Sequence, residues 1–72
     1  MANNERAKLR TLLGYWIEHG REHSQEFTEW ANRARGIGEP ETASELLRAA
    51  QEMEKAARSL SRALRSLDKG EP

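Results

Sequence analysis

Residues 15–30 read YWIEHGREHSQEFTEW and contain both histidines, both tryptophans and the only phenylalanine and tyrosine of the 72-residue chain. If this stretch is helical, its largest side chains recur at alternating steps of four and three residues, so they share one face. The members of this stripe are Trp16, Gly20, His23, Phe27 and Trp30. The pattern predicts an amphipathic helix whose buried face carries one small and one ionisable residue.

The same spacing extends in both directions, from Leu9 to Ala34, without an intervening proline. Such an unbroken heptad pattern predicts a first helix over about residues 4–35 that packs against another helix. Asn3 or Asn4 is the expected N-cap, because an asparagine side chain accepts a hydrogen bond from a first-turn N–H.

A short turn over residues 36–40 is expected to end this helix. Gly36 suits the left-handed C′ position, Ile37 the hydrophobic contact that follows it, and Pro40 the first position of a second helix. A second start signal, the capping box Thr-Ala-Ser-Glu of residues 42–45, lies just beyond. The sequence leaves both starts open.

The second helix is predicted over about residues 41–69 and has two stripes of its own. Its apolar stripe consists of Leu46, Ala50, Met53, Ala57, Leu60, Leu64 and Leu67. A parallel stripe of small residues consists of Ala49, Ala56 and Ala63. These small side chains would let another helix approach closely.

Together these features predict a single all-α domain over residues 1–72. The expected fold is an antiparallel two-helix hairpin, in which the numbers of facing residues add up to about 76. Its layers are Trp30 with Leu46, Phe27 with Ala49 and Ala50, His23 with Met53, Gly20 with Ala56 and Ala57, Trp16 with Leu60, and Leu9 with Leu67. The apolar surface is wider than one helix pair needs, since Leu12, Ile17 and Leu47 extend it. We therefore expect the hairpin to dimerise into a four-helix bundle.

Composition narrows the range of functions. The chain has 12 basic and 12 acidic residues, a formal net charge of zero and no cysteine. A neutral chain lacks the basic surface that attracts nucleic acids and anionic membranes, so neither is an expected partner. A domain of this size without disulfides is expected to gain stability from self-association or from a histidine and carboxylate metal site. Its apolar runs are too short for a signal peptide or a membrane span, which predicts a soluble, cytoplasmic protein.

His19, His23 and Glu26 are candidate metal ligands, because their spacing places two imidazoles and a carboxylate on one helical face. In a two-fold dimer a second set would reach the same place. Nitrogen and oxygen ligands without sulfur favour nickel, zinc, cobalt or iron. The other interpretation is structural: His23 is a half-buried histidine bonded to a carbonyl or to Glu26, and His19 is solvated.

Sequence patterns typical of catalysis are missing. Gly20 follows His19, so the zinc-protease pattern H-E-x-x-H is excluded, and Trp16 and Gly20 stand three residues before the histidines, which excludes the di-iron pattern E-x-x-H. The chain also has no Ser/His/Asp arrangement, P-loop or Rossmann glycine pattern. We therefore expect that the protein is not an enzyme.

Residues 12–23, LLGYWIEHGREH, are followed by Phe27 and Trp30. This stretch resembles a small uncharacterised helical domain of prokaryotes that has the pattern L-x-H-W-I-x-H-N-x-x-H and is sometimes seen with nickel- or other metal-handling proteins. The resemblance covers the first helix well and the second only in its alanine and leucine content.

The resemblance implies that His19 and His23 occupy the positions of that family's last two histidines. Tyr15 and Gly20 stand where the family has its first histidine and its asparagine. If that first histidine is an essential ligand, this chain lacks it.

Two functions are compatible with these observations. The first is a small self-associating structural or interaction module, which forms a homo-oligomer, most simply a dimer, or binds a helix of another protein through its apolar face. The alternative is a metal-binding or metal-handling protein that uses His19 and His23.

Overall fold

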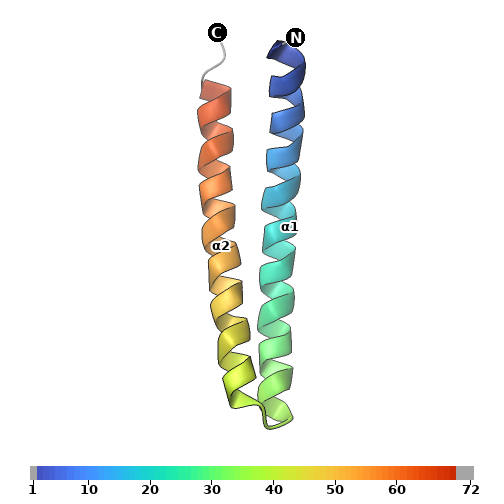
Figure 1. Cartoon of the computed structure of the whole chain (residues 1–72), viewed down its shortest axis with the longest axis vertical. Helices are drawn as coiled ribbons and strands as arrows, with labels where there is room; N and C mark the ends of the chain where they lie inside the picture. The colour runs from blue at the N-terminus through green and yellow to red at the C-terminus, as the bar shows by residue number, and fades with distance from the viewer. Residues whose placement is uncertain (1, 70–72) are drawn as a thin grey trace.

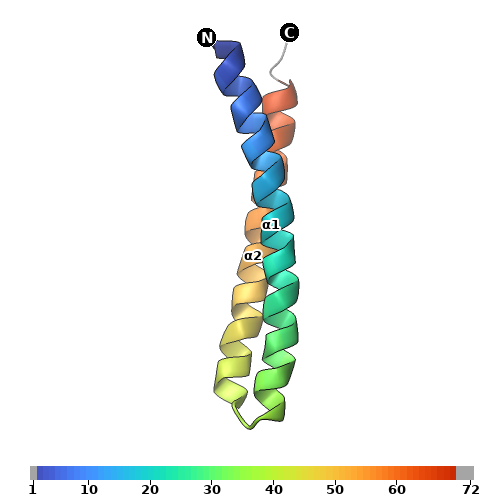
Figure 2. The same cartoon turned by 90° about the vertical axis from the view of Figure 1, so that its right-hand side faces the viewer.

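The computed structural model describes the backbone of residues 2–69 and the side chains of residues 4–69. Within this range the chain forms two helices, α1 (Ala2–Gly36) and α2 (Pro40–Lys69). The helices lie side by side and run in opposite directions, with the turn at one end and the start of α1 and the end of α2 at the other (Figure 1). Viewed from the side, they cross at a shallow angle (Figure 2). The predicted all-α hairpin is confirmed.

The first helix begins earlier than the sequence indicated. α1 starts at Ala2, so Asn3 and Asn4 lie inside its first turn and neither is the N-cap. The expectation of an asparagine cap was wrong. Glu5 lies in the first turn, where its carboxylate interacts favourably with the positive end of the helix dipole.

A glycine ends α1, but it is not the expected one. Gly38 has a φ of 84°, whereas Gly36 is still helical. The N–H of Gly38 donates to the carbonyl of Arg35 at 3.1 Å, and the N–H of Glu39 donates to the carbonyl of Ala34 at 2.9 Å. This pair of bonds is the Schellman motif, with Gly38 at C′. The sequence-based placement of Gly36 at C′ and Ile37 in the following hydrophobic contact was therefore wrong, and the Ile37 side chain is exposed.

The second helix starts at the earlier of its two signals. Pro40 is the first residue of α2, where its missing N–H and fixed φ are tolerated. The N–H of Ala43 donates to the carbonyl of Glu39 at 3.0 Å, which makes Glu39 the residue that flanks the helix. The Thr42–Glu45 stretch therefore lies within the first turns of α2 and does not begin it.

The stripe of α1 that faces α2 differs from the predicted stripe at three positions, each shifted by one residue. We call this the inner stripe; its residues, all buried or half-buried, are Leu13, Ile17, Gly20, Ser24, Phe27, Ala31 and Ala34. Four of them were predicted, but Ile17, Ser24 and Ala31 stand where the sequence reading placed Trp16, His23 and Trp30. Trp16 and Trp30 are exposed, so the predicted layers that paired them with α2 residues were wrong, whereas His23 is half-buried.

α2 uses the predicted apolar stripe. Every residue of that stripe is buried or half-buried, and Ala43 extends it toward the turn. The residues of α1 and α2 that face each other also match the expected pairing, in which their numbers add up to about 76. The hydroxyl of Ser24 donates to the carbonyl of Ala50 at 3.0 Å, and Arg10 and Asp68 form an ion pair at 2.8 Å. The tight layer of Gly20 includes Ala57 but not Ala56, which is exposed.

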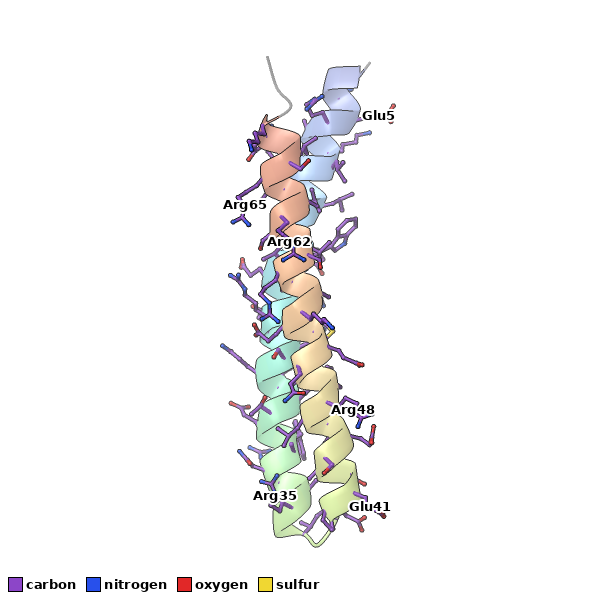
Figure 3. All side chains as sticks on the ribbon, turned by 90° about the vertical axis from the view of Figure 1, so that its left-hand side faces the viewer. Glu5, Arg35, Glu41, Arg48, Arg62 and Arg65 are labelled. Carbon is purple, nitrogen blue, oxygen red and sulfur yellow. The ribbon has the colours of Figure 1, made fainter. Side chains whose placement is uncertain are left out.

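Small side chains fill most of the fully buried positions between the helices, while the larger leucines of α2 are half-buried. Among the described residues the buried hydrophobic ones are Leu13, Ala31, Ala34, Ala43, Ala50 and Ala57. Charged side chains, among them Glu5, Arg35, Glu41, Arg48, Arg62 and Arg65, project outward along the whole length of the hairpin (Figure 3). Neither α1 nor α2, as far as the described residues extend, has a segment apolar enough to cross a bilayer.

Candidate functional site

Both tryptophans of α1, and Ile37 in the turn that follows it, lie outside the helix contact. Trp16 is 41% exposed, Trp30 56% and Ile37 78%. With Leu9 and His23 they form a second stripe with a constant step of seven residues, which we call the outer stripe: Leu9, Trp16, His23, Trp30 and Ile37. A seven-residue step keeps the first four side chains on one side of α1, as in a coiled coil, and Ile37 lines one groove with Trp30.

The outer stripe and the alanine stripe of α2 (Ala49, Ala56 and Ala63) lie on the same side of the hairpin. Trp30, Ile37 and Thr42 line one groove near the turn, and Thr42 is one heptad before Ala49. The opposite side has a different groove, lined by Ser24, Thr28, Leu47, Ala50, Gln51 and Glu54. One side of the hairpin therefore combines large side chains on α1 with small ones on α2.

Both histidines lie in a column of rings on α1, at steps of four residues. The Tyr15 and His19 rings are stacked with centroids 5.2 Å apart, and the His23 and Phe27 rings are stacked with centroids 5.8 Å apart. Between these pairs, the His19 and His23 rings meet edge to face at 4.2 Å. The flanking aromatic rings restrict the rotation of both imidazoles.

The two imidazoles contact each other through equivalent atoms. Nε2 of His23 lies 2.9 Å from Nε2 of His19, and Nδ1 of His23 lies 2.9 Å from Oε1 of Glu26. A carboxylate only accepts hydrogen bonds, so Nδ1 of His23 carries the proton and donates it. In a neutral His23 ring the lone pair is then on Nε2, and Nε2 of His19 is the donor in the contact between the rings. Nδ1 of His19 faces Oε1 of Glu22 at 3.9 Å.

The three predicted metal ligands are close together but do not surround one point. Glu26 bonds the Nδ1 side of His23, away from the Nε2 atoms that face each other. Among the described residues no group of three or more His, Cys, Asp or Glu side chains is placed to hold a metal ion. A single copy therefore offers two ligand nitrogens, with Glu26 as a supporting hydrogen-bond acceptor.

Ser24 is a polar contact residue that the sequence reading missed. It is only 5% exposed, and its hydroxyl donates to the Ala50 carbonyl on the facing helix. The signal was present, because Ser24 keeps the same alternating steps with Ile17, Gly20, Phe27 and Ala31. Its neighbour His23 has that spacing as well and is larger, so the sequence favours His23 over Ser24.

Near the turn, Arg33 covers part of the outer stripe. Its guanidinium carbon lies 4.6 Å from the centroid of the Trp30 ring, a cation–π contact. Trp30 is nevertheless more than half exposed. This end of the hairpin keeps a large apolar surface in contact with water.

A family model described as "Domain of unknown function (DUF8180)" matches residues 9–67. The search of curated proteins and the search of solved structures gave no match. The matched range includes most of both helices, the whole turn and both histidines. The family expected from the sequence was a small helical domain, and the chain belongs to the DUF8180 family of domains.

Proposed function

We propose that this protein is a self-associating structural module, in which two hairpins pack through the outer stripe and the alanine stripe into a two-fold four-helix bundle. The observation that carries this proposal is that the fully buried side chains are mostly small. Alanines fill most of the fully buried positions within the hairpin, whereas Trp16 and Trp30 are exposed. Fully burying an aromatic side chain is worth about 2–3 kcal/mol, so a second copy would recover a large free energy.

The exposed area supports a partner of about this size. The chain exposes 5682 Å². A compact monomer of 8.2 kDa exposes about 4,500 Å², so the hairpin has an excess of about 1,100 Å². A standard protein interface buries about 800 Å² on each partner. The excess is therefore of the size that an interface with one further protein of this kind buries.

The side-chain pattern favours a second copy as that partner. The outer stripe is symmetric in side-chain type about His23, with a tryptophan seven residues away on each side and Leu9 and Ile37 at its ends. The alanine stripe is likewise symmetric about Ala56. A two-fold axis perpendicular to the helices at the level of His23 would superpose the outer stripe on its own copy in reverse. Such an interface is isologous, with Trp16 of each copy meeting Trp30 of the other.

Electrostatics also permits two copies to meet. Twelve basic and twelve acidic residues give a formal net charge of zero, so no net repulsion opposes the contact. Antiparallel neighbouring helices also align their dipoles favourably. We assign α1 to pack on α1 of the second copy, and α2 on its α2.

The test is the molecular mass in solution. Sedimentation equilibrium of the wild-type protein at micromolar concentration is expected to give twice the chain mass of 8.2 kDa. Trp16→Glu and Trp30→Glu are expected to give monomers, because a charge would be buried in the interface. Gln25→Glu is the matched control, since it adds the same charge at an exposed position on the other side of α1.

Two results would overturn the proposal. A wild-type monomer with full helicity at micromolar concentration would mean that the exposed stripes need no partner. A dimer that survives both tryptophan substitutions would place the interface on another surface.

A further inference from the structure

We infer that the dimer holds one zinc-class divalent ion between four imidazoles, His19 and His23 of each copy. The inference rests on the self-association proposed above, since one copy supplies only two ligand nitrogens. It adds a ligand and a stoichiometry: one Zn²⁺, Co²⁺ or Ni²⁺ ion for every two chains.

The pair in one copy is nearly in ligand geometry. Its two Nε2 atoms lie 2.9 Å apart. Two nitrogens bound to one zinc ion at about 2.0–2.1 Å, at a tetrahedral angle, lie about 3.3–3.4 Å apart. Small side-chain rotations would open the pair by this difference of about 0.4 Å. Both side chains are partly exposed, 47% for His19 and 37% for His23, so an ion can reach them.

The hydrogen bonds around the pair suit metal binding. Glu26 fixes the proton of His23 on Nδ1 and leaves Nε2 free to coordinate, the arrangement that orients most metal-binding histidines. His19 needs one change: its proton moves from Nε2 to Nδ1, which faces the Glu22 carboxylate at 3.9 Å. The ion thus replaces the proton between the rings, and no net proton is released from two neutral imidazoles.

The position of the pair along the hairpin brings the two copies' histidines together. α1 runs from Ala2 to Gly36, so its midpoint is His19. The symmetry of the outer stripe about His23 places the two-fold axis of the proposed dimer at the level of His23, four residues from this midpoint. Only residues near that level meet their own symmetry mates; His23 is at it, and His19 is about one helical turn away. Other residues of α1 meet different residues of the partner helix.

The donor set selects the class of ion. Four neutral imidazole nitrogens suit Zn²⁺, Co²⁺ and Ni²⁺, whereas Mg²⁺ and Ca²⁺ require oxygen ligands. Aromatic rings flank the pair on both sides, Tyr15 above His19 and Phe27 below His23. These rings limit the approach of water and keep the coordination number low.

The test uses the untagged wild-type protein and Co²⁺ as a spectroscopic probe. Titration is expected to produce the strong visible absorption of tetrahedral Co²⁺ and to reach its end point at one ion per two chains. Added Zn²⁺ should then remove the absorption. His19→Gln and His23→Gln are each expected to abolish the signal, while circular dichroism and sedimentation remain those of the wild type.

Glu26→Ala separates the supporting hydrogen bond from a general charge effect. Loss of an outer-shell acceptor is expected to weaken Co²⁺ binding about 10–100-fold. Glu29→Ala is the matched control, because it removes an exposed carboxylate from the same helix and should leave the affinity unchanged. Equal affinities of the two variants would contradict the role given to Glu26.

The outcomes distinguish this inference from the proposed function. A dimer that gives no absorption with Co²⁺ overturns the metal site and leaves the association intact. An end point of one ion per chain overturns the four-imidazole arrangement. A monomer at every Co²⁺ concentration overturns both.

Discussion

Side-chain length determines which stripe of α1 faces α2. Ser24 and Ala31 bring the helix axes close together, whereas His23 and Trp30 in the same places would hold them apart. The close approach allows the Ser24 hydroxyl to reach the Ala50 carbonyl at 3.0 Å. Gly20 is not required for this approach, because a Cβ added there would meet Met53 and Ala57 at 3.9–4.0 Å, which are ordinary contact distances.

At this scale we predict that Ala57→Leu is strongly destabilising. Ala57 is 1% exposed and lies opposite Gly20, so the larger side chain would overpack the contact and cost about 1–3 kcal/mol. Ala7→Leu is the control, because Ala7 is exposed on α1 and leucine has nearly the helix propensity of alanine. Urea unfolding followed by circular dichroism measures both. Similar free energies of unfolding for the two variants would contradict the observed contact.

The ends of the helices depend on backbone geometry that residue type alone does not fix. Two glycines two residues apart, Gly36 at the end of α1 and Gly38 in the turn, could each end the helix, and only Gly38 adopts a positive φ. Both positions are compatible with the sequence, because a helix that continues for two more residues moves the Schellman motif with it. The structure has the later position, which lets Pro40 follow directly as the first residue of α2.

Alanine substitution at the two glycines should therefore have opposite effects. Gly36→Ala is expected to stabilise the fold by about 1 kcal/mol, since Gly36 is helical and nothing lies within 4 Å of an added Cβ. Gly38→Ala is expected to destabilise it by about 1 kcal/mol, because a left-handed conformation is costly for alanine. Thermal melts of both variants would measure this. If Gly36→Ala were the less stable one, the C′ assignment would be wrong.

Periodicity predicted the helices and the contact stripe of α2, but only half of the contact stripe of α1. On α2 the leucines and alanines define a single apolar direction. On α1 the stripes that contain His23 and Ser24 are adjacent and equally regular, so spacing alone does not choose between them. Size favours the stripe that contains Trp16 and Trp30, but the structure has the smaller residues inside. The candidate ligands His19, His23 and Glu26 were recognisable from spacing, but the bond of Glu26 to Nδ1 of His23 required side-chain positions.

The hairpin as a whole is long and thin. Its dimensions are 55 × 15 × 12 Å and its radius of gyration is 16.4 Å. A compact domain of 72 residues has a radius of gyration of about 11 Å. A two-helix layer of this shape covers only one side of each helix, which leaves the outer stripe and the alanine stripe together on one open side.

The orientation of the two copies is the last prediction. The described residues have no cysteine, and neither does the rest of the sequence, so a single introduced thiol reports on one position. In the end-over-end dimer the turns lie at opposite ends of a bundle about as long as one hairpin, 55 Å. Ile37→Cys alone should therefore not be linked by a bis-maleimide that spans about 11 Å, roughly two helical turns. A mixture of the Ile37→Cys and Leu9→Cys proteins should be linked, because those two ends of the outer stripe meet. Denaturing electrophoresis of the mixture and of each variant alone gives the readout.

Efficient linking of Ile37→Cys alone would place both turns at the same end, where α1 packs on α2 of the second copy. The four imidazoles would then be divided between helices that are not neighbours, and that result would exclude the shared ion as well as the orientation.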